Sequence, residues 1–338
     1  MNSLAMQSLR SSNLLRQLRR PLASAAAPSA NPLRPSGPPV IFDRNAKKLQ
    51  RDRASRHPNS RATDYLKDEI ANRLVDRILD VKNKYPTIVD LGSGAGHLVK
   101  YLDTDITSKV IMCDMSRDLL YRDQELDAER EVEIERRVLD EESNLLSAFE
   151  ENSLDMIVSN LSMHWVNDLP GMLIQARKCL KPDGVFIGAM FGGDSIFELR
   201  TSLQLAELER EGGISPRVSP MTVVADMGGL LSRAGLTLTT VDVDEIVVDY
   251  PSPYDLMDDL RAMGESNAVF QRRPLLKRDT LAAASSIYQS MHGNPDGSIP
   301  ATFQVIYLIG WKPAPTQPKP LARGSGQVNL KKVLAESA

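Results

Sequence analysis

The segment Thr87–Leu98, which reads TIVDLGSGAGHL, constrains the fold more than any other part of the chain. A run of β-branched and apolar residues ends at Asp90, and glycines follow at alternate positions before a helical pattern begins. This order predicts a buried strand, a tight turn and a helix whose first N–H groups face a ligand. Glycine suits such a turn because a Cβ would keep the backbone away from a ligand and because the turn needs φ above zero.

The glycine spacing indicates which kind of ligand to expect. The dinucleotide fingerprint would have its third glycine at position 97, where this chain has His97. This departure favours S-adenosylmethionine over NAD or FAD. Glycines also serve plain tight turns, but a preceding strand that ends in an acid favours a loop for a nucleoside cofactor. The residues expected at the cofactor are Asp90, Leu91, Gly92, Gly94 and Gly96.

Acidic residues end the next two predicted strands. Asp114 closes the strand at 109–114 and follows the glycine loop at the distance where an acid accepts hydrogen bonds from ribose hydroxyls. Alone it could be a helix N-cap, but with the glycine loop it favours the ribose role, and Met115 beside it is expected at the same site. Asp140 and Glu141 end the strand at 133–140 and could hold an adenine amino group, although a helix cap explains them nearly as well.

A polar and aromatic segment follows the well-formed strand pattern at 154–160. Open α/β sheets bind ligands just beyond the carboxyl ends of their strands. We therefore expect Asn160 and Leu161 on the cofactor side, and His164 and Trp165 along the pocket of the acceptor. Helix capping would also explain Asn160, and packing explains Trp165 equally well.

Strands and helices alternate as far as a strand at 184–191, which predicts a parallel sheet with right-handed crossovers. The pattern then changes to helices at 195–211 and 219–234, strand material with an acidic stripe at 236–250, two further helices and a last strand at 301–311. Before the sheet, a helix at 65–81 is preceded by a basic helical segment at 40–51. That basic segment suits an acidic partner or lipid head groups, although a solvated helix face is the more common explanation.

The composition of the two ends predicts how the chain is organised and where it acts. Residues 1–38 are rich in Arg, Ser, Ala and Pro and lack acids, which is typical of a mitochondrial transit peptide, with a disordered basic tail as the alternative. The rest of the chain has more acids than bases, which disfavours nucleic acid as a partner. The two cysteines fit a reducing compartment, no apolar run could span a bilayer, and the Pro- and Lys-rich residues 313–338 are expected to be disordered.

Longer motifs resemble known families. The segment Asp90–Gly96, an acid ending the second strand, and Leu180-Lys-Pro-Asp-Gly184 before the fifth resemble the class I S-adenosylmethionine methyltransferase superfamily. A closer resemblance is to mitochondrial complex I assembly factors, which are related to the malonyl-carrier-protein methyltransferases of biotin synthesis. The motifs that carry it are Ser159–Leu169, Gly188–Asp194, Glu198–Arg200, Gln204–Gly213 and Met263–Asn267.

The resemblance implies a fold and a cellular role. The fold is α/β, a Rossmann-like class I methyltransferase domain at 85–312, with a seven-stranded, mostly parallel sheet, helices on both faces and a helical insertion at about 194–235. Basic and covering helices at 39–84 precede it. The cofactor is S-adenosylmethionine. The location is the matrix side of the inner mitochondrial membrane, with peripheral attachment. Members of the family are described as hydroxylating an arginine of the quinone-module iron–sulfur subunit of complex I, alongside other assembly factors, with methyl transfer also open.

The residues themselves do not show hydroxylation. Iron-dependent hydroxylases often hold the metal with two histidines and a carboxylate, but the four histidines here are far apart in the chain and none forms a His-x-Asp pair, so no metal site is expected. Methyl transfer mainly requires that the acceptor be positioned and desolvated. Acids suit a guanidinium acceptor, and the candidates are Glu198, Glu207 and the turn Glu265–Asn267.

Two other functions remain open on the sequence. One is a carboxyl O-methyltransferase of the malonyl-carrier-protein type, against which the transit signal and the Gln204–Gly213 segment speak. The other is an assembly chaperone that binds the cofactor without catalysis.

Overall fold

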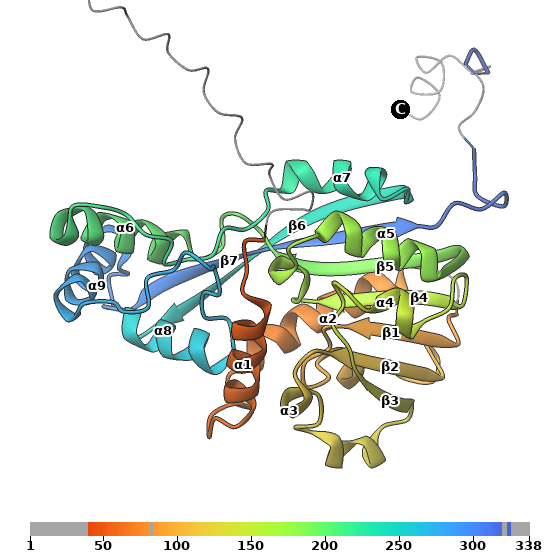
Figure 1. Cartoon of the computed structure of the whole chain (residues 1–338), viewed down its shortest axis with the longest axis horizontal. Helices are drawn as coiled ribbons and strands as arrows, with labels where there is room; N and C mark the ends of the chain where they lie inside the picture. The colour runs from red at the N-terminus through yellow and green to blue at the C-terminus, as the bar shows by residue number, and fades with distance from the viewer. Residues whose placement is uncertain (1–39, 82–83, 320–322, 326–338) are drawn as a thin grey trace, which may run out of the picture. The chain divides into compact units, whose positions relative to one another are not determined.

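The computed structural model describes residues 40–81, 84–319 and 323–325 (Figure 1). The expected transit peptide and most of the expected C-terminal tail lie outside these residues. Within them, seven strands form one sheet in the order β3-β2-β1-β4-β5-β7-β6. Strands β1 to β5 run parallel, and β7 is antiparallel to both of its neighbours, which confirms the predicted sheet. The strands are β1 (Thr87–Leu91), β2 (Lys109–Asp114), β3 (Glu133–Val138), β4 (Leu154–Asn160), β5 (Leu180–Phe191), β6 (Thr237–Tyr250) and β7 (Ile299–Trp311).

Helices cover both faces of the sheet because its central strands are apolar on both sides. The apolar core on one face includes side chains from α2 (Tyr65–Leu79), α6 (Phe197–Glu211), α8 (Pro253–Ala262) and α9 (Arg278–His292). The core on the other face includes α4 (Leu145–Ala148), α5 (Leu169–Cys179) and α7 (Val224–Arg233). The remaining elements are α1 (Arg44–Ser55), α3 (Arg117–Leu120) and three 3₁₀ turns, η1 (Leu98–Tyr101), η2 (Gln124–Glu129) and η3 (Met163–Trp165).

The residues after the glycine loop differ from the prediction. The expected helix is a single 3₁₀ turn, η1. The carboxylate of Asp103 accepts hydrogen bonds from the backbone N–H groups of Asp105 and Ile106 and so turns the chain. The prediction of a helix directed at the ligand was therefore wrong, and the loop must act through its own backbone.

The helices at 194–235 separate in space. Helix α6 packs against α9, whereas α7 lies against α5 and β6 on the other side of the sheet (Figure 1). The helical layer beside the sheet is therefore built from α6 together with α8 and α9, which connect β6 to β7. Two acids of β6 face α2, where Asp242 pairs with Arg77 and Asp244 with Arg73.

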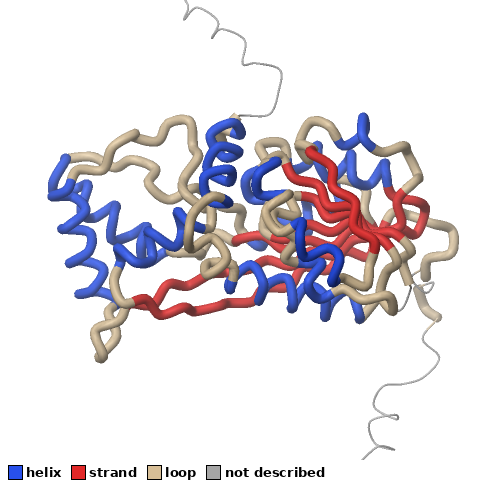
Figure 2. The backbone as a smooth tube through the Cα atoms, turned by 90° about the horizontal axis from the view of Figure 1, so that it is seen from below, coloured by secondary structure: helices blue, strands red, loops and turns tan. Residues whose placement is uncertain are grey.

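Strands β6 and β7 extend beyond the rest of the sheet. Residues 299–304 of β7 pair with β6 alone, while its later residues also pair with β5. Figure 2 shows this two-stranded ribbon projecting away from the bundled strands. In the described residues no helix is both long enough and apolar enough to cross a membrane.

Candidate functional site

The glycine loop follows β1 in a backbone conformation that requires glycine. Gly92, Gly94 and Gly96 all have positive φ, at 69°, 58° and 92°. A Cβ added to Gly92 would lie 2.1 Å from the side chain of Ser162, which comes from the turn after β4. The loop therefore lies directly against the carboxyl end of β4, where the sequence placed the ligand.

Asp114 is the central acid of this edge. Its side chain is completely buried at the end of β2, and it accepts hydrogen bonds from the backbone N–H groups of Gly94 (3.1 Å) and Ser116 (2.7 Å). These bonds fix the carboxylate beside the glycine loop. The ribose-binding role of Asp114 stays a prediction, and the structure places its carboxylate beside the glycine loop, as that role requires.

Several buried polar atoms at this edge have no hydrogen-bond partner. They are Asp90 Oδ1, Ser93 Oγ, Glu141 Oε2 and Asn160 Oδ1. Buried polar groups are almost always paired, so a cluster of unpaired atoms indicates a ligand-binding position. Acceptors of this kind suit the amino and hydroxyl groups of S-adenosylmethionine, and the residues present fit that cofactor. Burial, with a further contribution from Asp114, raises the pKa of Asp90 to about 8.

Helix α1 closes this cofactor edge. The guanidinium of Arg51 lies 3.2 Å from the carboxylate of Asp114 and donates a hydrogen bond to Ser162 Oγ. Arg44, near the start of the same helix, forms ion pairs with Asp140 and Glu141. The cavity that remains measures about 10 Å³, which is room for about one water molecule. Helix α1 lies between α3 and α8 (Figure 1). Because the guanidinium of Arg51 occupies the space beside Asp114, Arg51 must move before a nucleoside can bind there.

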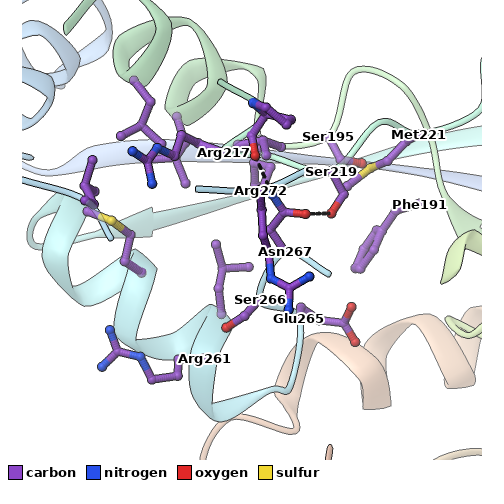
Figure 3. A pocket seen from close by; sticks show the side chains of 18 of the residues that line it. Phe191, Ser195, Arg217, Ser219, Met221, Arg261, Glu265, Ser266, Asn267 and Arg272 are labelled. Atoms are coloured by element: carbon purple, nitrogen blue, oxygen red, sulfur yellow. Dashed lines mark hydrogen bonds between the residues drawn. The ribbon is translucent and has the colours of Figure 1, made fainter. Parts of the chain in front are cut away.

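The second half of the site is a cavity of about 400 Å³ under α6 and α8. Figure 3 shows Phe191, Ser195 and Met221 on one side of it, with Glu265 and Ser266 on the turn after α8. Most of the residues that line the cavity are apolar, and the buried carboxylate of Glu265 lies at its wall. The lining also includes four arginines, each of which forms an ion pair with an acid outside the lining: Arg217 with Glu207, Arg261 with Asp258, Arg272 with Asp43 and Arg273 with Glu211. The cavity can therefore hold a largely aliphatic side chain that carries a positive charge.

Glu265 connects the cavity with the segment after β4. Its carboxylate accepts a hydrogen bond from Trp165 Nε1 at 2.7 Å and lies 3.3 Å from His164 Nε2 and 3.4 Å from Lys67 Nζ. Burial would raise the pKa of Glu265, but Lys67, His164 and Lys47 outweigh it and hold that pKa well below its usual range. The carboxylate is therefore ionised at neutral pH. Burial dominates at His164 and lowers its pKa, so its ring is neutral and Nδ1 has no partner.

The structure brings most of the predicted site residues together. Leu161 adjoins Asp114 in the small cavity, and Trp165 adjoins Glu265 in the large one. Leu91 and Met115 are buried at the ends of β1 and β2.

Two predicted acids lie outside both cavities and have structural partners. Glu198 accepts hydrogen bonds from the backbone N–H and hydroxyl of Thr302 and so joins α6 to β7. Glu207 accepts from Ser215 and pairs with Arg217.

Sequence reasoning missed the contribution of α1. The structure buries Lys47 and Arg51, so the interpretation of this helix as a solvated basic face was wrong. A signal was present, because Arg44, Lys47 and Arg51 are spaced three and four residues apart and therefore share one helix face. The position of that face against Asp114 and Glu265 depends on tertiary packing and cannot be read from the spacing.

Comparisons with known proteins agree with this fold. A family model described as a methyltransferase domain matches residues 89–188. The mitochondrial arginine-hydroxylase NDUFAF5 of Homo sapiens is 48% identical over 290 residues, which cover 86% of this chain and 82% of the relative. The malonyl-[acyl-carrier protein] O-methyltransferase of Methylovorus sp. (strain MP688) is 31% identical over 255 residues, covering 73% of this chain and 82% of the relative. A solved structure from Bacillus halodurans C-125, described as a methyltransferase, has a TM-score of 0.50 at 14% identity and covers 71% of this chain and 99% of its own.

Proposed function

The chain belongs to the family of mitochondrial arginine hydroxylases named NDUFAF5, and on that premise we propose that it hydroxylates an arginine of the quinone-module iron–sulfur subunit during early assembly of respiratory complex I. The protein is a mitochondrial enzyme with a methyltransferase-type domain, and its cofactor is S-adenosylmethionine. It works on the matrix side of the inner membrane with peripheral attachment. The sequence resemblance supports this location, the subunit and the association with other assembly factors.

One structural observation supports an arginine side chain as the substrate. The ionised carboxylate of Glu265 lies at the wall of a mostly apolar cavity, next to the segment that follows β4. A guanidinium is delocalised, always charged and weakly hydrated, and it binds carboxylates through paired hydrogen bonds. The apolar wall suits the aliphatic stem of an arginine, and Glu265 suits its charged end.

The cofactor would be held at the other half of the site. Asp114 would accept hydrogen bonds from the ribose hydroxyls, and the backbone of Gly92 to Gly96 would lie against the cofactor. Asn160 and Glu141 would receive its amino groups through their unpaired oxygens. When bound, S-adenosylmethionine supplies an electrophilic methyl group on a sulfonium. The residues of the chain position the acceptor and exclude water from it, which is the main requirement for transfer at such a centre.

Hydroxylation requires O₂ and a reductant in addition to the residues of this site. Conversion of a C–H bond to C–OH with O₂ leaves one oxygen atom as water and consumes two electrons from a reductant. The contribution of the described residues is to bind and orient the arginine. Methyl transfer is the second candidate, and the 31% identity to a malonyl-carrier-protein O-methyltransferase favours it over a non-enzymatic role. The higher identity to the hydroxylase, 48%, favours hydroxylation.

Mass analysis of the quinone-module subunit tests the proposal. The subunit is purified from cells that lack this protein and carry the wild-type chain, Glu265→Gln or no replacement. We expect an increase of about 16 Da on one arginine with the wild-type chain and its loss with Glu265→Gln. An increase of about 14 Da would instead establish methylation. An unchanged mass together with normal complex I assembly would leave only a chaperone role.

A further inference from the structure

A buried lysine of α1 occupies a site built for an organic cation. The ammonium of Lys47 lies 3.3 Å from the centre of the Trp165 ring and donates hydrogen bonds to the backbone carbonyls of Gly264 (3.0 Å) and Ser266 (2.7 Å). The carboxylate of Glu265, between those carbonyls in sequence, interacts with it electrostatically. We call these four groups, the Trp165 ring, the two carbonyls and the Glu265 carboxylate, the cation cage.

The chemistry of the cation cage suits a guanidinium as well as an ammonium. An aromatic face attracts a cation through its quadrupole, and Arg is a more frequent partner of such rings than Lys. Carbonyl and carboxylate oxygens accept the N–H groups of a guanidinium in its own plane. The cage also adjoins the large cavity, because Trp165, Glu265 and Ser266 line that cavity. A side chain that enters through the cavity therefore reaches the cage.

Lys47 does more than hold α1 in place. Burial of an ammonium costs several kcal/mol, and here burial lowers the pKa of Lys47 well below its usual value. One helix turn further on, Arg51 of the same helix contacts Asp114 at the cofactor edge. Two basic side chains of one helix thus occupy two acidic positions, one in each half of the candidate site, and a single movement of α1 would open both.

We propose that the cation cage receives the guanidinium of the arginine substrate and that Lys47 fills the cage until α1 moves away. The proposal rests on the proposed function, since it takes the substrate to be an arginine. Lys47 then acts as an internal competitor of that arginine, and it prevents the cavity from admitting a substrate before the cofactor edge has opened.

Replacement of Lys47 tests this competition. The variant Lys47→Met removes the charge while keeping an unbranched side chain, and Lys48→Met is the matched control because Lys48 is exposed on the same helix. The probes are N-acetyl-L-arginine amide and its neutral analogue N-acetyl-L-citrulline amide, with binding followed by calorimetry. We expect Lys47→Met to bind the arginine probe at least tenfold more tightly than the wild-type chain or Lys48→Met, and the citrulline probe to bind to none of them.

Three results would overturn the proposal. The first is that Lys47→Met and Lys48→Met bind the arginine probe with equal affinity. The second is that Lys47→Met binds the arginine and citrulline probes equally well. The third is that Lys47→Met binds methylguanidinium but not the larger arginine probe. If Lys47→Met does not fold, the intact Lys47 chain saturated with S-adenosylmethionine provides a second measurement. There Trp165→Leu should weaken binding of the arginine probe at least tenfold, Trp311→Leu should not, and equal affinities would refute the cage. Probe binding needs no turnover, so an unchanged mass of the complex I subunit would refute the proposed function and leave the cage intact.

Discussion

Some residues at the cofactor edge are held in states of unfavourable free energy. Asp90 is buried at the end of β1 beside a second acid, Asp114, and one of its oxygens has no partner. A carboxyl group in such surroundings favours its neutral form. The titration of Asp90 should therefore be visible in the stability of the protein.

The pH dependence of the free energy of unfolding should reveal the titration of Asp90. Its pKa in the folded state is about 8 against a usual 3.8, so between these values the folded state binds a proton that the unfolded state has lost. Stability should therefore fall as the pH rises through this window, by up to about 1.4 kcal/mol per pH unit. Asp90→Asn should lose this decline.

The measurement is urea unfolding of wild-type and Asp90→Asn chains at pH 5, 6.5 and 8. The exposed Asp105→Asn serves as the control. Parallel pH dependences for the wild-type chain and Asp90→Asn would show that Asp90 is ionised throughout.

At the scale of elements, α1 controls access to the site. The sequence predicted this helix but not its burial, because its basic residues have an ordinary alternative on the surface of a protein. Its contacts with Asp114, Asp140 and the turn at 264–267 span the cofactor edge and the substrate cavity. Occupancy of one cavity should therefore change the affinity of the other.

Arg51→Met should show separately how α1 affects the stability of the protein and how it affects the affinity for the cofactor. Loss of the guanidinium leaves Asp114 buried without a charged partner, which should lower the free energy of unfolding by about 3–5 kcal/mol. The same loss frees Asp114 for a ribose, so the affinity for S-adenosylmethionine should rise at least tenfold, or about 1.4 kcal/mol. Calorimetry and urea unfolding measure the two quantities, with the exposed Arg53→Met as the control. Equal cofactor affinities in the two variants would show that Arg51 does not obstruct the site.

At the scale of the whole molecule, the helices and strands were predictable along the described chain, but the contacts between the elements after β5 were not. The glycine loop, Asp114 and the strand at 154–160 form a local pattern, and the structure places them together because parallel strands end at the same edge. The segments after β5 share no such pattern. Glu198 appeared to be a site residue from its motif, yet its partner Thr302 lies on the last strand, a contact too distant in sequence to infer.

Cofactor binding should stabilise the whole domain. A ligand that binds only the folded state at 100 times its Kd adds about 2.7 kcal/mol to the free energy of unfolding. For a chain of this size we expect the Tm to rise by about 4–5 °C. Asp114→Asn should abolish most of this rise. A scanning calorimetry series with S-adenosylhomocysteine and adenosine provides the comparison, and an undiminished rise in Asp114→Asn would exclude the ribose contact.

The place of β7 in the sheet determines when the protein can finish folding. Among the described residues this strand comes last in sequence, yet it lies between β5 and β6 and supplies hydrogen bonds to both. Until residue 311 has emerged from a ribosome or a translocation channel, β5 has an exposed edge, β6 has no neighbour, and Glu198 lacks its partner. Exposed strand edges pair readily with other chains. A nascent or truncated chain therefore depends on shielding by other proteins until its final strand arrives, and premature stop codons before β7 should produce aggregates rather than weakly active enzyme.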